Sequence, residues 1–188
     1  MRPEYNLEDV LAARRVSSGA ARAAPASRII ECDPSLVALA GECGARIAER
    51  IHTADHVISA AGEKQSLAAA ADAVEMESFE VVKEAVAFGA RSVVIRAISD
   101  TAGEELPLDM NLVLTDDGQI STSRIVGQLA RRPWALAGLL RLGARSKRAA
   151  ESLARFLDAY VLALAQRTSQ VQAQNSTGEQ VWTAPLGR

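Results

Sequence analysis

The sequence is poor in several residue types, and each shortage excludes a class of protein. Only two of its 188 residues are cysteines, Cys32 and Cys43, and they form neither a CxxC pair nor a zinc-ligand spacing. That pattern excludes a disulfide-stapled miniprotein and favours a reducing compartment. No apolar run reaches the roughly 18 residues of a membrane span. Aromatic residues make up 4% of the chain, so we expect a core of mainly alanine, valine, leucine and isoleucine.

Net charge is also small. The formal charge is −2 with 23% charged residues, so the chain has no overall basic field and we expect no nucleic-acid partner. The first residues lack the apolar stretch of a secretory signal. We therefore expect a cytoplasmic protein.

The charge is unevenly distributed along the chain. Residues 131–167 hold eight basic and two acidic residues. The simpler interpretation is a solvated outer face of C-terminal helices that pack on the rest of the fold. The alternative is contact with anionic lipid, a nucleic acid or an acidic partner. Of these, we retain contact with a membrane surface as the alternative to the simpler interpretation.

Length and periodicity predict one α/β domain. A chain of 188 residues and 19.9 kDa suits a single domain, which we place at 1–168, followed by a polar, aperiodic tail at 169–188 that we expect to be disordered. The β-branched run 92–98 predicts a strand buried on both faces. With a helix and a strand before it, the run indicates a βαβ unit in a largely parallel sheet. We expect further strands at 8–16, 57–60 and 73–76, a loop at 17–28, and helices at 33–50, 63–70, 77–88, 121–132 and 144–167, with a short one from Pro133.

Carboxylates follow two of these strands. Asp100 comes directly after Ser99 at the end of the buried strand, and Glu75 and Glu77 flank Met76 at the end of the strand before it. Ligands of open parallel sheets bind at the carboxyl ends of the strands. Because side chains alternate along a strand, Glu75 and Glu77 are expected on one face. These residues therefore predict a site that combines a proton donor with a carboxylate able to accept hydrogen bonds from a diol.

Two linked motifs carry a family resemblance. The segment Val74-Glu75-Met76-Glu77, followed after one helix and one strand by Arg96-Ala97-Ile98-Ser99-Asp100, resembles the purine nucleoside phosphorylase and nucleosidase superfamily. It is most similar to the methylthioadenosine/S-adenosylhomocysteine nucleosidase branch. The segment 55–58 resembles the family's base-binding strand, and 8–10 resembles its G-D-V segment. The basic C-terminal helices are also similar to those of the hopanoid-associated phosphorylases.

The resemblance implies a fold, a reaction and a set of roles. It implies a partial three-layer α/β/α sandwich with a mostly parallel central sheet, and cleavage of the N-glycosidic bond of purine nucleosides by water or by phosphate. Phosphate is then a co-substrate, and neither another cofactor nor a metal is expected. Relatives of this kind are homo-oligomers, so a homo-oligomer is expected. The implied roles are Asp100 as proton donor to N7 of the purine, Glu77 on the ribose hydroxyls, Met76 against the sugar, Ser99 and Arg96 orienting the acid and its surroundings, and Val57 and Ile58 lining the base pocket.

Other features keep alternatives open. In the family, the first strands, a glycine-rich turn and the acidic residue that activates water precede the G-D-V segment, whereas this chain begins at about that segment and has no G-x-G. An inactive remnant of such an enzyme and a hopanoid-associated phosphorylase-like protein are the alternatives. His52 and His56 are four residues apart but lack the pattern of a zinc protease, so no metal site is expected. Glu63 and Lys64 are expected at a solvated helix start.

Overall fold

The computed structural model describes residues 5–19, 28–101, 106–113, 115 and 121–178. Its centre is a five-stranded sheet built around β1, Val10–Ser18. On one edge, β1 pairs in parallel with β3 (Arg46–Thr53), and β3 pairs in parallel with β4 (Ala73–Glu75). On its other edge, β1 pairs antiparallel with β5 (Val94–Ala97) along its first half and with β2 (Arg28–Glu31) along its second half.

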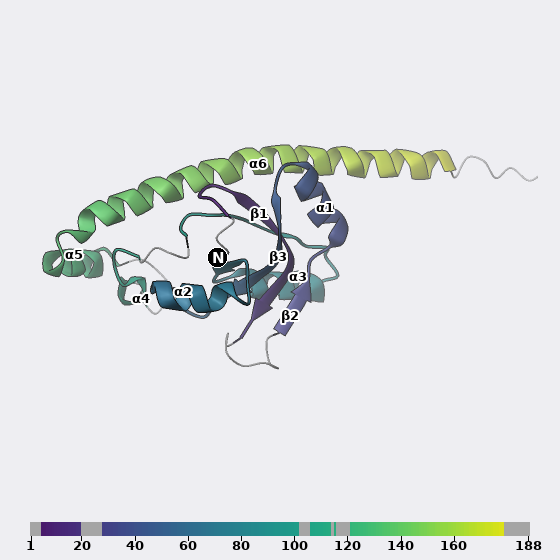
Figure 1. Ribbon diagram of the computed structural model, residues 1–188. Coiled ribbons are helices and arrows are strands. Elements are labelled where there is room, and N and C mark those ends of the chain that lie inside the picture. The colour runs from purple at the N-terminus through teal and green to yellow at the C-terminus, as the bar shows by residue number, and fades with distance from the viewer. Residues whose placement is uncertain (1–4, 20–27, 102–105, 114, 116–120, 179–188) are drawn as a thin grey trace, which may run out of the picture.

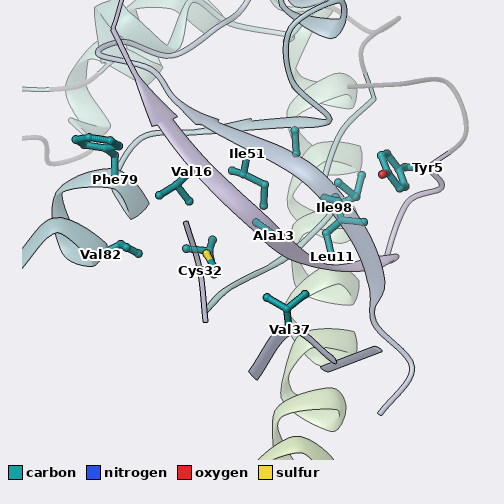
Figure 2. Packing of buried hydrophobic residues seen from close by; sticks show 13 residues of the cluster. Tyr5, Leu11, Ala13, Val16, Cys32, Val37, Ile51, Phe79, Val82 and Ile98 are labelled. Atoms are coloured by element: carbon teal, nitrogen blue, oxygen red, sulfur yellow. The ribbon is translucent and has the colours of Figure 1, made fainter. Parts of the chain in front are cut away.

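Helices cover both faces of this sheet (Figure 1). Helices α1 (Pro34–Glu42) and α6 (Ala135–Gly178) cover one face, where Val10 and Ala12 of β1 pack with Phe156 and Tyr160 of α6. Helix α3 (Ser78–Ala87) covers the other. There, Leu11 and Ala13 share a cluster with Phe79 and Val82, as Figure 2 shows. Successive residues of β1 thus alternate between two cores, which confirms the α/β class with a central sheet between helical layers.

The remaining short helices lie together at one end of the molecule. Helices α2 (Ala61–Ala68), α4 (Met110–Val113) and α5 (Thr122–Arg131) gather at the left of Figure 1, and the long α6 runs back from them across the sheet. Ser121 caps α5 by accepting a hydrogen bond from the backbone of Arg124. No helix in the described ranges is long and apolar enough to cross a bilayer.

Several sequence-based expectations are confirmed to within one to three residues at each end. The strands expected at 73–76 and 92–98 are β4 and β5, and the strand expected at 8–16 is β1. The helices expected at 63–70, 77–88 and 121–132 are α2, α3 and α5. Of these, α3 has a clear apolar periodicity and α5 has a capping serine, which are local features that a sequence pattern reports.

The segment 33–60 differs from its prediction. The helix expected over 33–50 ends at Glu42, because Gly44 adopts a positive φ of 101° that turns the chain into β3. The strand therefore lies at 46–53, and 57–60, expected as a strand, is irregular. Asp33 caps α1 as expected, accepting hydrogen bonds from the backbones of Ser35 and Leu36.

Other corrections concern strand direction and the C-terminal helices. Strand β5 is antiparallel to β1, so β4, α3 and β5 do not form the parallel βαβ unit that their order suggested. Strand β2 and helix α4 were not anticipated. The two helices expected after Pro133 are one continuous helix, and it continues through 169–178 of the expected disordered tail. The rest of that tail, 179–188, lies outside the described residues.

Candidate active site

Asp100 lies just beyond the end of β5 and contacts a buried lysine. Its Oδ2 forms an ion pair with Nζ of Lys64, and its Oδ1 lies 3.2 Å from Oγ of Ser99. Lys64 comes from α2, and only 7% of its side chain is exposed, against 25% for Asp100. The expectation that Lys64 lies on a solvated helix start is therefore wrong, and no spacing in the sequence links it to a carboxylate 36 residues away.

Glu75, at the end of β4, is held by a dense set of donors. Its carboxylate accepts hydrogen bonds from Oγ1 of Thr53 at 2.5 Å, from Nη2 of Arg96 at 2.5 Å and from Oγ of Ser78 at 2.9 Å. The backbone N–H groups of Glu77 and Ser78 donate to it as well. Its side chain is 12% exposed. Glu75 thus joins β3, β4, β5 and the first turn of α3 at one corner of the fold.

These donors decide the charge of Glu75. Burial on its own raises the pKa of a carboxyl group, but the hydrogen bonds from Thr53, from the backbones of Glu77 and Ser78 and from the Ser78 hydroxyl outweigh it and lower the pKa of Glu75. Its carboxylate is consequently ionised at neutral pH. All of its observed partners are residues of the fold, so Glu75 acts as a structural anchor.

Glu77 lies beside the same guanidinium in a different environment. Nη2 of Arg96, which donates to Glu75 and to Oγ of Ser78 at 3.0 Å, lies 3.6 Å from the Glu77 carboxylate. The Glu77 side chain is 77% exposed. Arg96, expected to orient the acid and its surroundings, contacts this glutamate pair, while Ser99 contacts Asp100 itself.

Asp100 and Met76 belong to the shared lining of two adjoining cavities. The first, which we call the β4–β5 cavity, has a volume of about 290 Å³ and includes Glu77, Arg96 and Ser99 in its lining. The second, the Val57 cavity, has a volume of about 170 Å³ and is lined by Val57, Ile58, Lys64 and His56 among others. Both are also lined by Val74, Glu75, Met76 and Asp100. All seven residues selected from the sequence therefore line these two adjoining cavities.

A third cavity lies on another side of Asp100. Its volume is about 420 Å³, and its lining includes Arg132, Trp134, Arg141 and Arg145 as well as Asp100. It is open to solvent along the first turns of α6. Asp100 lines all three cavities, and it is the ionisable residue that they share.

Asn111 of α4 holds the wall of the Val57 cavity. Its Oδ1 accepts a hydrogen bond from the Val57 N–H, and its Nδ2 donates to the Val57 carbonyl, both at 2.9 Å. Val57 thus offers its side chain to the cavity while its backbone is paired. The two positions are 54 residues apart, so no local sequence pattern could indicate this contact.

The two histidines have separate partners. His56, in the Val57 cavity, has Nδ1 at 2.6 Å from Asp55 and Nε2 at 2.9 Å from Glu63, and these hydrogen bonds raise its pKa. His52 is buried in β3, where its Nδ1 lies 3.1 Å from the hydroxyl of Ser17, and burial lowers its pKa. The residues that the structure describes contain no group of three or more side chains suited to a metal ion.

Comparison with solved structures identifies the fold. Neither a protein-family model nor a curated protein sequence matches the chain. Futalosine hydrolase of Helicobacter pylori strain 26695 aligns with a TM-score of 0.55 and 21% identity over 83% of this chain and 60% of that one. The 5′-methylthioadenosine/S-adenosylhomocysteine nucleosidase of Helicobacter pylori gives 0.54 and 20% over 85% and 62%. The Campylobacter jejuni nucleosidase is 25% identical over 68% of this chain and 61% of that one, with a TM-score of 0.49.

The chain has the fold of the two Helicobacter pylori enzymes. This agrees with the resemblance carried by the segments 74–77 and 96–100, and it confirms the expected fold class. The chain spans about three fifths of the length of the solved structures that it matches. The likeness establishes the architecture, while the chemistry of this chain has to be argued from its own residues.

Proposed function

We propose that the protein cleaves the N-glycosidic bond of purine nucleosides, with Asp100 as the proton donor. The observation that carries this proposal is that Asp100 and Met76 line both of two adjoining cavities. A nucleoside has two parts of different chemistry joined by a single bond. A base in the Val57 cavity and a ribose in the β4–β5 cavity would place that bond beside Asp100 and Met76.

The lining of each cavity suits the part assigned to it. Val57 and Ile58 offer apolar side chains to a planar base. In the β4–β5 cavity, the exposed carboxylate of Glu77 is available to accept hydrogen bonds from the two ribose hydroxyls. Met76 lines both cavities, and its flexible apolar side chain can pack against the sugar there.

The reaction needs a proton on the leaving base. When the bond between C1′ and the purine nitrogen breaks, its electron pair goes to the base. Asp100 takes up a proton from solvent, passes it to N7 to neutralise the departing anion, and returns to the carboxylate that pairs with Lys64. Water or phosphate then bonds to C1′. Lys64 and Ser99, which contact the two carboxyl oxygens, act as positioning residues for Asp100.

The proposal is tested by looking for free base. The purified full chain is incubated with methylthioadenosine, S-adenosylhomocysteine, adenosine and inosine, each with and without phosphate, and the products are separated by chromatography. We expect release of adenine or hypoxanthine from at least one of them. Release without phosphate identifies hydrolysis, and release that needs phosphate identifies phosphorolysis.

A folded chain that releases no base from any of these nucleosides would contradict the proposal. So would release that is unchanged in Asp100→Asn. A binding measurement with the same nucleosides then separates the alternative of an inactive remnant, which binds without turnover, from a protein with no affinity for nucleosides.

A further inference from the structure

The junction of α5 and α6 concentrates positive charge. Residues 122–148, which we call the basic elbow, comprise α5, the turn through Trp134 and the beginning of α6. This segment contains no acidic residue, in a chain whose net charge is −2. Its seven basic residues are Arg124, Arg131, Arg132, Arg141, Arg145, Lys147 and Arg148.

The basic elbow also exposes large apolar side chains. Trp134 is 74% exposed and Leu140 is 67% exposed, and Leu136 and Val126 are exposed as well. Leu136 and Leu140 are four residues apart on α6 and share one face of the helix. None of the ten residues of α5 is buried, although its apolar residues are confined to one side. An amphipathic helix whose apolar side is not buried in its own fold is typical of a surface that meets something else.

This surface lies away from the sheet, at the left end of the molecule in Figure 1. Helix α5 is attached to α4 by two hydrogen bonds between Gln128 and the backbone of Asp109. Within the basic elbow only Ala135 is buried, whereas further along α6 Ala149, Phe156 and Tyr160 are buried, the last two against the sheet. The elbow therefore contributes little to the main core.

We propose that the basic elbow docks on the surface of an anionic lipid bilayer. Basic amphipathic helices bind such surfaces by combining attraction to phosphate groups with insertion of apolar side chains at the headgroup level. Tryptophan is favoured at that level because its ring is large and apolar and its N–H is polar. Trp134, Leu136 and Leu140 would enter the interface, and the surrounding arginines would bind lipid phosphates.

The charge pattern favours a bilayer over other occupants. Two copies of this chain that met through the basic elbow would bring like charges together, which opposes association. The phosphates of a nucleic acid would pair with the basic side chains, but the apolar side chains of Trp134, Leu136 and Leu140 would remain in water. The proposal is independent of the proposed nucleoside chemistry, since it rests on no residue to which that chemistry assigns a role.

Flotation with lipid vesicles tests the proposal. The full chain is mixed with vesicles of phosphatidylglycerol and phosphatidylcholine in equal parts, or of phosphatidylcholine alone, at low and high salt. We expect flotation with the anionic vesicles only, and its loss as salt rises. The double variant Trp134→Ser/Leu140→Ser should bind about tenfold or more weakly, whereas Phe88→Ser, which removes an apolar side chain 87% exposed at the end of α3, should bind normally.

Fluorescence reports the depth of Trp134 directly. The chain has two tryptophans, and the second, Trp182, lies outside the described residues. In a Trp182→Phe background, tryptophan fluorescence therefore comes from Trp134 alone. We expect its emission to shift to shorter wavelength with anionic vesicles. Three results would overturn the proposal: no flotation at low salt, equal loss of flotation in Phe88→Ser, or tight binding to duplex DNA that displaces the vesicles without an emission shift. The proposal would also be overturned if the parent chain does not float but self-associates, and Trp134→Ser/Leu140→Ser abolishes that self-association. The basic elbow would then bind a second copy of the chain.

Discussion

Glu75 is the last residue of β4 and Asp100 lies beyond the end of β5, and both line the same two cavities, but their surroundings differ. Glu75 receives hydrogen bonds from two side-chain hydroxyls, two backbone N–H groups and a guanidinium. Asp100 contacts one ammonium group and one hydroxyl and is twice as exposed. The acceptor positions of the Glu75 carboxylate are occupied by donors of the fold, whereas Asp100 has fewer partners and lines three cavities.

The difference teaches which carboxylate holds the structure together and which is available for chemistry. A buried carboxylate with every acceptor position occupied stabilises its neighbours and cannot easily exchange a proton with a ligand. A carboxylate with fewer fixed partners beside open space can. Substitutions at the two positions should therefore separate stability from activity.

The largest effect is expected from Asp100→Asn. An amide of the same shape cannot donate the proton that the leaving purine needs, so turnover should fall about 10²- to 10⁴-fold. The measurement is the rate of base release from the nucleoside that the parent cleaves best.

Asp100→Asn also leaves the buried Lys64 ammonium without its counter-ion, so a control for stability is needed. The double variant Lys64→Met/Asp100→Asn removes both charges and should recover most of the lost stability while remaining inactive. Recovery of turnover in the double variant would show that the rate loss came from misfolding and would remove Asp100 from the mechanism.

Glu75→Gln should produce the second largest effect, on stability. The variant removes the charge that five donors stabilise, and it presents an amide N–H₂ to some of them, so we expect a loss of about 2–3 kcal/mol in the free energy of unfolding. Denaturant unfolding measures it. Glu77→Gln is the matched control, two residues away and 77% exposed, and should change stability by less than about 0.5 kcal/mol.

The Glu75 contribution should also depend on pH. Folding lowers the pKa of Glu75, so the ionised form stabilises the folded state above its unfolded pKa of about 4.3. That stabilisation is lost as the pH falls through the lower pKa of the folded state. The difference in stability between parent and Glu75→Gln should therefore shrink in acid. A constant difference from neutral pH to acid would contradict the assignment of Glu75 as an ionised anchor.

Lys64→Met should have a smaller effect, confined to the rate. The ammonium fixes one oxygen of Asp100, so its loss should lower kcat about tenfold through poorer orientation of the acid. KM should change little, because the Lys64 ammonium, although its residue lines the Val57 cavity, is paired with Asp100. Lys83→Met, on the exposed side of α3, is the matched control. A rise in KM at unchanged kcat would mean that Lys64 contacts the substrate instead.

Glu77→Gln should have the smallest effect, on binding. A neutral amide accepts hydrogen bonds from a ribose less strongly than a carboxylate, so KM should rise about tenfold. The effect should vanish with a substrate analogue that lacks both ribose hydroxyls. Equal losses on both substrates would contradict a role of Glu77 at the diol.

The sequence predicted the strands that precede or contain the candidate site residues around Glu75 and Asp100, but not how those strands pair. The segments 74–77 and 96–100 were each placed at the end of an expected strand, and in the structure a hydrogen bond from Arg96 to Glu75 joins them. The direction of β5 was not predictable, since hydrophobic periodicity is the same for parallel and antiparallel strands. The end of α1 was missed because the apolar spacing of Cys43 and Ile47 continues the helical period through a glycine turn.

The contacts that Asp100 and Val57 make with residues far away in the sequence could not be predicted either. Lys64 and Asn111 are polar residues on short helices, and nothing in their local sequence distinguishes them from solvated side chains. Only the packing of α2 and α4 near the cavities brings them to Asp100 and Val57. The long α6 was divided before residue 144 in the prediction. Its predicted end at 167 came too early, because the polar composition of 169–178 is that of a tail even though the backbone is helical.

The most direct test of the central claim compares two leaving groups in Asp100→Asn. A purine needs a proton to depart, whereas the nitrophenolate of a nitrophenyl riboside departs without one. The account predicts that Asp100→Asn loses base release from the purine nucleoside while it still cleaves the nitrophenyl riboside at close to the parent rate. Equal loss of activity on both substrates would contradict the assignment of Asp100 as the proton donor.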